Sequence, residues 1–269
     1  MVGALGLLLI AAGVWLVLAA VGWWFGERLI FPRPPVSYGG HEDLLALRAP
    51  TGERVAARWL ANPGARLALL YSHGNYEDLG TIHPEAERLR RLGFAVLTYD
   101  YRGYGCSEGR CTVRGAVADL EAAYRWLREE KDYTPDRVVL YGRSVGGGPT
   151  LDLAVREPVG GVILEGTFLT AFRVVTRIPL LPFDHFRNDL LVGRVDCPLL
   201  VTHGTRDRVV PFSHGRALFR RAPEPKRHLW VEGAGHNDLT LVAGAAYEEA
   251  VREFRGMVEE RLDARGPAG

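Results

Sequence analysis

Short apolar runs alternate with longer amphipathic runs from residue 67 to residue 262. The apolar runs have the length of buried strands, and the amphipathic runs have the length and period of helices. Parallel strands joined through helices make right-handed crossovers, so the alternation predicts an α/β fold with a doubly wound, mostly parallel sheet. The predicted strands are 67–72, 94–99, 137–141, 161–164, 199–203 and 228–231. The predicted helices are 84–92, 113–129, one directly after Ser144, 214–221 and 246–262.

Two β-rich runs, 44–48 and 54–60, precede this pattern, and the turn between them contains Pro50 and Gly52. Proline and glycine favour tight turns, so the two runs are predicted to form an antiparallel pair. The globular part is therefore predicted to be one α/β domain over residues 43–269.

The N-terminal stretch 2–25 is apolar and contains no charged residue. A helix of this length crosses the hydrocarbon core of a bilayer, which is about 30 Å thick. Aromatic residues at its end, Trp23 and Trp24, suit the water interface. We predict a membrane-anchor helix over 1–27 and a stiff, proline-rich linker over 28–42. A cleaved secretory signal is the alternative, but the stretch lacks a basic start and a small-residue cleavage site.

The positive charges that flank this helix, Arg28 and Arg33, lie on its C-terminal side. Because positive flanks tend to remain inside, the sequence predicts a cell-membrane protein whose globular domain faces the cytoplasm. The lipid bilayer is then a partner, through residues 2–25.

Composition argues against several other classes of protein. The 33 basic and 32 acidic residues give a net charge of +1 with no clustered basic face, so nucleic acid is not an expected partner. Phosphate-loop, dinucleotide and metal-ligand motifs are missing, so neither a cofactor nor a metal is predicted. Cys106 and Cys111 are close enough in one loop for a disulfide in an oxidising compartment; otherwise they and Cys197 are buried or incidental thiols.

Ser144 lies in the motif Gly-Arg-Ser-Val-Gly, between the strand 137–141 and the helix that follows. Small flanking residues let a chain pass from strand to helix through a strained turn that exposes the hydroxyl. The N-terminus of the next helix then points its positive end toward the same place. Ser144 is therefore predicted to be a nucleophile.

A serine nucleophile needs a base, and the base needs an orienting acid. Asp207 follows the strand 199–203 and His236 follows the strand 228–231, in the loops at corresponding strand ends. The two residues therefore complete a predicted Ser144–His236–Asp207 triad. Asp238 is a rival acid, but it follows a different strand end from the one expected.

The strand 67–72 ends in a loop that contains His73, Gly74, Asn75 and Tyr76. The oxyanion formed during acyl transfer needs hydrogen-bond donors, and the backbone N–H groups of Asn75 and Val145 are predicted to supply them. His73 is predicted to be a structural hydrogen-bonding residue, and Tyr76 is predicted to contact the substrate.

The segment 166–191 is rich in apolar residues, lacks a clear period and is too long for an ordinary connection. It is predicted to be a lid-like insertion, with a pair of short helices packed on the sheet edge as the alternative. Five of its apolar residues are predicted to line a groove for a hydrocarbon chain. They are Phe168, Phe172, Ile178, Leu180 and Leu181.

Five stretches together resemble the α/β-hydrolase-domain serine hydrolases that include the protein depalmitoylases and their bacterial membrane-anchored relatives. They are SHGNYEDLG, YDYRGYGCSEG, LYGRSVGGGPTLDLA, VTHGTRDRVVPFSHGRAL and LWVEGAGHNDL. The resemblance runs from about residue 67 to the C-terminus and implies the α/β-hydrolase fold, the Ser144, Asp207, His236 triad and cleavage of acyl esters or thioesters. The lipidated cysteine cluster of the depalmitoylases has no counterpart, because the first cysteine is Cys106 and an apolar helix takes its place.

The predicted function is that of a membrane-anchored serine hydrolase that cleaves acyl esters or thioesters through an acyl-enzyme. The acyl chain would belong to a lipid, a lysophospholipid, an acylglycerol or an acylated protein. The alternatives are a serine peptidase of the same fold and a non-catalytic, ligand-binding member of it.

Overall fold

Residues 3–39 and 44–265 are described by a computed structural model of the chain. Parts of the predicted anchor (1–2), linker (40–42) and domain (43 and 266–269) lie outside the described residues. An eight-stranded sheet with the order β1-β2-β4-β3-β5-β6-β7-β8 forms the centre of the domain. The strands are β1 Leu45–Arg48, β2 Arg54–Leu60, β3 Ala68–Ser72, β4 Ala95–Tyr99, β5 Val138–Arg143, β6 Gly161–Glu165, β7 Leu199–Gly204 and β8 Lys226–Val231.

The sheet is mostly parallel, as the alternating pattern predicts. β1 pairs antiparallel with β2, and β2 pairs antiparallel with β4. The remaining neighbours, from β4 through β3 to β8, pair in parallel. The predicted doubly wound α/β architecture and its opening antiparallel pair are confirmed.

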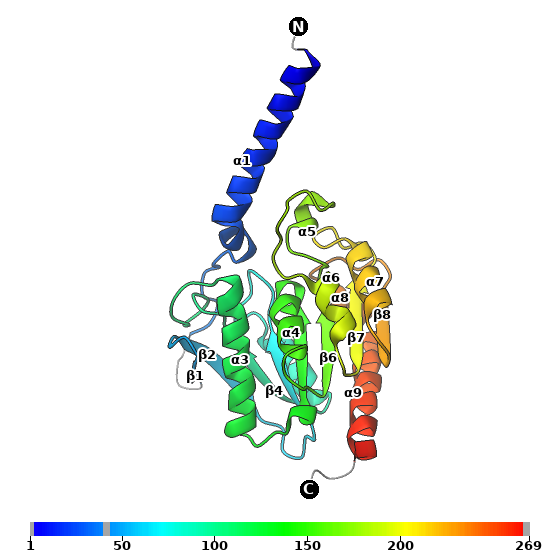
Figure 1. Ribbon diagram of the computed structural model, residues 1–269. Coiled ribbons are helices and arrows are strands. Elements are labelled where there is room, and N and C mark those ends of the chain that lie inside the picture. Colours follow the sequence, from blue (N-terminus) through cyan, green and yellow to red (C-terminus); the bar gives the residue numbers. More distant parts are fainter. Residues whose placement is uncertain (1–2, 40–43, 266–269) are drawn as a thin grey trace.

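Helices cover both faces of this sheet (Figure 1). The helices of the domain are α2 His83–Arg91, α3 Val113–Glu129, α4 Gly147–Ala154, α5 Arg173–Thr176, α6 Asn188–Leu191, α7 Phe212–Arg221, α8 Leu239–Ala243 and α9 Ala245–Arg265. Neighbouring residues of one strand face opposite cores: Leu70 belongs to the core that contains Leu120 of α3, whereas Leu69 belongs to the core that contains Phe254 of α9. Because the central strands are buried on both faces, they appear in the sequence as continuous apolar runs.

The predicted helices and strands lie within a few residues of the observed ones, and the predicted helix 113–129 has the bounds of α3. The short helix α8, Leu239–Ala243, was not predicted. A helix of this length is too short to show an apolar period in the sequence.

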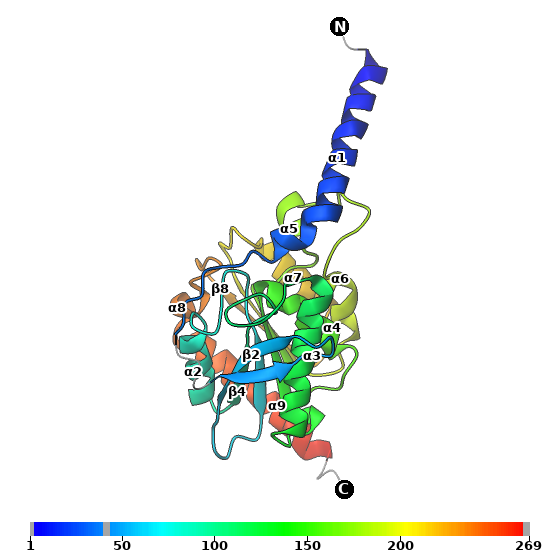
Figure 2. The same ribbon diagram turned by 90° about the vertical axis from the view of Figure 1, so that its left-hand side faces the viewer.

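The N-terminal helix α1 spans Ala4–Ile30 and projects away from the domain in both views (Figures 1 and 2). It is long and apolar enough to cross a membrane, by length and composition. Its C-terminal end is attached to the domain, because Glu27 Oε1 accepts a hydrogen bond of 2.9 Å from the backbone N–H of Val113.

The prediction of a stiff spacer over 28–42 needs correction in its described part. The helix continues to Ile30, past the predicted end at residue 27. Phe31 is buried in the core, where its ring meets Tyr101 edge-on. Tyr38 donates a hydrogen bond of 2.5 Å to Asp100. An aromatic ring and a hydroxyl with buried partners bind this segment to the domain surface, so it does not separate the helix from the domain.

The insertion over 166–191 combines both sequence-based expectations. It contains two short helices, α5 and α6, and α5 lies beside the lower end of α1 in both views (Figures 1 and 2). Asn188 of α6 is buried and donates a hydrogen bond of 3.0 Å to the Phe168 carbonyl, which holds the insertion closed on itself. We call residues 166–191 the lid segment below.

Candidate active site

Ser144 lies where β5 turns sharply into the next helix, with a backbone φ of +52°. A left-handed conformation is unusual for a residue with a side chain and is typical of strained functional turns. A Cβ added to Gly146 would lie 2.1 Å from the Ser72 carbonyl oxygen, and one on Gly142 would lie 2.6 Å from the Gly147 Cα. Glycine at both flanking positions is therefore required for this close strand-to-helix passage.

The three predicted triad residues lie within hydrogen-bonding reach of one another. His236 Nε2 is 3.0 Å from Ser144 Oγ, and His236 Nδ1 is 2.7 Å from Asp207 Oδ2. In the arrangement needed for catalysis, the Nδ1–H donates to the carboxylate and Nε2 accepts from the serine hydroxyl. The structure thus brings together residues from the ends of β5, β7 and β8.

The surroundings of Asp207 favour its charged form. Burial raises the pKa of this carboxyl, but the hydrogen bonds from His203 and His236 outweigh burial and place the pKa below its ordinary value. The backbone N–H groups of Val209 and Val210 also donate to Oδ1, at 2.9 and 2.8 Å. The carboxylate is therefore fixed in place and ready to orient His236.

The rival acid, Asp238, has a different role. Its Oδ1 accepts a hydrogen bond of 2.6 Å from the backbone N–H of Gly235. The side chain thus stabilises the turn of the histidine loop, and Asp207 occupies the acid position beside His236.

The two predicted oxyanion donors, Asn75 and Val145, line the same cavity as Ser144. Val145 lies in the first turn of a helix, where backbone N–H groups lack an intrahelical acceptor. The Asn75 side chain donates a hydrogen bond of 3.4 Å to the Ile30 carbonyl at the end of α1. The loop that carries one predicted donor therefore contacts the N-terminal helix directly.

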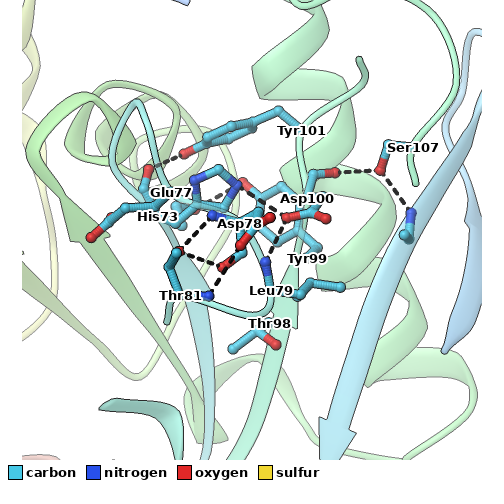
Figure 3. A network of polar contacts seen from close by, with 12 residues as sticks. His73, Glu77, Asp78, Leu79, Thr81, Thr98, Tyr99, Asp100, Tyr101 and Ser107 are labelled. Atoms are coloured by element: carbon cyan, nitrogen blue, oxygen red, sulfur yellow. Dashed lines mark hydrogen bonds and ion pairs between the residues drawn. The ribbon is translucent and has the colours of Figure 1, made fainter. Parts of the chain in front are cut away.

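A buried network around Asp100 holds this loop against the end of β4 (Figure 3). Asp100 Oδ1 accepts a hydrogen bond of 2.9 Å from the Leu79 N–H, and its backbone carbonyl accepts one of 2.8 Å from Ser107. Burial raises the pKa of Asp100 to about 7. The hydrogen bonds of Asp100 can therefore hold the predicted oxyanion loop in position.

His73 has the structural role that the sequence predicts. It is fully buried, and its Nδ1 is 2.7 Å from the Gly74 carbonyl. The Tyr101 hydroxyl donates a hydrogen bond of 2.8 Å to the His73 carbonyl. Burial lowers the pKa of its imidazole, so the neutral form is favoured.

Ser144 lines a largely apolar cavity of about 310 Å³. This volume falls in the range of small-molecule sites. Of the residues predicted to contact substrate, four line the cavity: Phe168, Phe172, Leu180 and Leu181.

The other two residues predicted to contact substrate, Tyr76 and Ile178, lie outside this lining. Tyr76 has a φ of +61° and is 67% exposed, so the turn directs its ring into solvent. Ile178 follows Arg177, which has a φ of +63°, and is 60% exposed. In both cases a left-handed backbone changes the direction of the chain in a way that sequence spacing does not reveal.

Sequence reasoning missed the part of the lining that comes from other segments. The loop of Asp207 contributes Val209 and Val210, and α1 contributes Leu18, Val21, Gly22, Leu29 and Ile30. The sequence did contain a sign that α1 packs against another element. Gly22 and Gly26 are spaced about one helical turn apart, as in helices that pack closely.

Arg143, beside the nucleophile, is another residue that sequence reasoning missed. Its guanidinium is ion-paired with Glu77 and, at 3.0 Å, with Glu165. It also donates hydrogen bonds to the His236 carbonyl at 3.2 Å and to Asn237 Oδ1 at 3.0 Å. Arg143 therefore joins the serine turn, the oxyanion loop and the histidine loop.

A second buried acid, Glu85 of α2, gives a testable pH dependence. Burial and the nearby charge of Glu165 raise its pKa, Arg88 lowers it, and the net result is a pKa of about 7. An acid whose pKa is raised by folding stabilises the fold most below its unfolded pKa, about 4.5, and loses this contribution as the pH rises through 7. We expect Glu85→Gln to reduce the loss of unfolding free energy between pH 5 and pH 8 by about 2 kcal/mol.

The measurement is the thermal unfolding midpoint of the whole chain in detergent at both pH values. Glu87→Gln, on the same helix and ion-paired with Arg90, is the matched control and should leave the difference between the two midpoints unchanged. An unchanged pH dependence in Glu85→Gln would contradict the prediction.

Among residues 3–39 and 44–265, no group of three or more His, Cys, Asp or Glu side chains could hold a metal ion. Cys111 and Cys197 are buried, and Cys106 is exposed. Nothing in the arrangement of the triad requires a cofactor, because the serine, the histidine and the carboxylate supply the nucleophile and the proton transfers.

Comparisons with known proteins relate this site to a family. A family model described as serine aminopeptidase, S33, matches residues 63–182. The protein named alpha/beta hydrolase domain-containing protein 17C, from Xenopus laevis, is 42% identical over 197 residues, covering 72% of this chain and 62% of that protein. The chain thus spans less than two thirds of the frog protein. The human protein named alpha/beta hydrolase domain-containing protein 17B is 39% identical over 211 residues, covering 77% of this chain and 73% of that protein.

Among solved structures, the Pyrococcus furiosus esterase Pf2001 is similar, with a TM-score of 0.70 at 19% sequence identity. The similarity covers 85% of this chain and 100% of the esterase chain. At this identity the likeness shows the fold alone, and it confirms the predicted α/β-hydrolase fold.

Proposed function

Because this chain belongs to the alpha/beta hydrolase domain family of the proteins named 17B and 17C, and is a serine hydrolase by family and fold, we propose that it cleaves acyl esters or thioesters at a membrane. One observation carries the proposal. Ser144, within reach of His236, lines an apolar cavity that suits a hydrocarbon chain.

The mechanism follows from the positions of the three side chains. Ser144 Oγ attacks the acyl carbonyl while His236 Nε2 takes the hydroxyl proton, and Asp207 stabilises the imidazolium that forms. The backbone N–H groups of Asn75 and Val145 are proposed to stabilise the oxyanion. His236 then protonates the leaving alcohol or thiol. Water, activated by the same histidine, hydrolyses the acyl-enzyme and restores the serine.

The helix α1 is proposed to anchor the enzyme in the bilayer and to keep its active site at the membrane surface. Its length and apolar character suit a single crossing. The charged residues Arg28 and Arg33 follow the apolar stretch, which favours a cytoplasmic catalytic domain.

The matching family model is described as an aminopeptidase, so peptide cleavage is the second candidate. The cavity argues against it. A bound peptide carries N–H and C=O groups that need hydrogen-bond partners when they leave water, whereas this cavity is lined mainly by aliphatic and aromatic side chains. A hydrocarbon chain has no such requirement.

Chain-length dependence tests the proposal. The whole chain in detergent is assayed with p-nitrophenyl esters from acetate to palmitate, with a palmitoyl-thioester peptide and with an aminoacyl p-nitroanilide. We expect kcat/KM to rise at least about tenfold from acetate to the preferred longer chain, because each added methylene gains apolar contact in the cavity.

The anilide serves as the comparison for peptide cleavage and is expected to be a poor substrate. A strict preference for acetate, or faster cleavage of the anilide than of every ester, would refute acyl-chain chemistry.

A further inference from the structure

The N-terminal helix takes part in the cavity as well as in membrane attachment. Leu18, Val21 and Gly22 of α1 line the cavity together with residues of the lid segment, and Leu29 and Ile30 line it as Asn75 does. The helix and the lid segment therefore both contribute to the wall of the cavity.

Two glycines allow the lid segment to approach α1 this closely. A Cβ added to Gly26 would lie 2.7 Å from Phe172 Cζ, and one added to Gly22 would lie 2.9 Å from Leu181 Cδ1. Gly22 and Gly26 are the buried positions of α1. Gly13, two to three turns earlier, has nothing within 4 Å of an added Cβ. Small residues are thus needed where the lid segment packs, whereas the helix surface at Gly13 is open.

Aromatic contacts extend this packing along the helix. The Trp15 indole N–H donates a hydrogen bond of 2.9 Å to the Leu180 carbonyl, and the Trp23 ring meets Phe183 edge-on at 5.4 Å. Trp15 lies about 13 Å along the helix from Trp24, which is well inside the apolar stretch. Val175 and Ile178 of the lid segment are 83% and 60% exposed. Leu180 of the lid segment therefore lies beside the part of α1 that suits lipid, and the same segment carries exposed apolar side chains.

We propose that α1 is one wall of the acyl-chain site, and that the site takes a long acyl chain directly from the bilayer through the contact between α1 and the lid segment. This inference rests on the proposed function. An acyl chain that enters between two apolar elements facing the membrane stays out of water throughout. A route through solvent would expose its hydrocarbon to water. Gly22 is then a specificity-determining residue, because a side chain at this position would displace Leu181, which lines the cavity.

The experiment uses the whole chain in phosphatidylcholine vesicles, with p-nitrophenyl palmitate in the vesicles and p-nitrophenyl butyrate in solution. Gly22→Leu places a side chain between α1 and Leu181, and we expect it to lower the palmitate-to-butyrate ratio of kcat/KM at least about tenfold. Gly13→Leu makes the same chemical change on the open face of the same helix and is expected to leave the ratio within about twofold.

A rescue variant separates loss of space from general damage. Leu181→Ala removes the side chain that an added Cβ at position 22 would meet, so combining it with Gly22→Leu should restore the ratio to within about threefold of the wild type. Labelling of Ser144 by a fluorophosphonate checks that each variant is folded. If Gly22→Leu fails this check, Gly22→Ala replaces it, with an expected fall of about threefold.

The outcomes are distinct. A ratio that Gly22→Leu leaves unchanged, an equal loss on both esters in a folded variant, or an unrescued double variant would overturn the role of α1. The proposed function fails by a different result, namely a wild-type chain that cleaves none of the esters.

Discussion

Replacing Ser144 with alanine is expected to lower kcat/KM for the best acyl ester by about 10⁴-fold to 10⁶-fold. The reason is that Ser144 Oγ, 3.0 Å from His236 Nε2, is the atom placed to form the covalent intermediate. Without it, the oxyanion donors and the cavity can only bind the substrate. Esterase assays and labelling by a fluorophosphonate measure the loss, and the variant should fail to label.

His236→Ala should cause a loss of similar size, and the double variant should lose little more than either single variant, because the two residues act as one unit. Ser213→Ala is the control, since Ser213 is an exposed serine of α7. Labelling that persists in Ser144→Ala would show that another residue is the nucleophile.

Asp207→Asn is expected to produce the next largest effect, a fall in kcat of about 10³-fold at neutral pH. Asp207 Oδ2 is 2.7 Å from His236 Nδ1, and an amide there can present an N–H that favours the wrong tautomer of the imidazole. The substrate-binding cavity is unchanged, so KM should change much less than kcat.

The same substitution has a predictable effect on stability. The folded pKa of Asp207 is below its ordinary value, so the carboxylate stabilises the fold above its unfolded pKa, about 3.8, and loses this contribution as the pH falls. The loss occurs below this unfolded pKa, so Asp207→Asn should lower the thermal midpoint at pH 7 more than at pH 2. Asp238→Asn, the nearby acid that bonds Gly235, is the control and should retain most activity. A kcat for Asp207→Asn within tenfold of the wild type would contradict the assigned role.

Much of the fold could be predicted because its signals are local. A central strand such as β5 is buried on both faces and therefore appears as a continuous apolar run. The turn at Ser144 requires glycine close by, and these glycines, Gly142 and Gly146, lie two residues away on either side. The positions of Asp207 and His236 were predictable for a related reason: the ends of parallel strands meet at one sheet edge, so order along the chain becomes proximity in space.

Other parts of the site depend on contacts between residues that are far apart in the sequence. Arg143 contacts Glu77 and Asn237, and Trp15 contacts the carbonyl of Leu180. No local pattern records such pairs, because each exists only when whole elements have packed. The positions of Tyr76 and Ile178 outside the cavity lining were not predictable for a similar reason, since a left-handed residue lies at or next to each one.

The amino-acid sequence by itself determined the α/β order, the sharp turn at Ser144 and an apolar helix of membrane-crossing length, because period, glycine spacing and hydropathy act over neighbouring residues. The tertiary structure alone decided that this helix packs on the lid segment through Gly22 and Gly26 and becomes a wall of the cavity at Ser144. The reason is physical: a cavity is the space left between elements, and its shape follows from how they pack and from no single one of them.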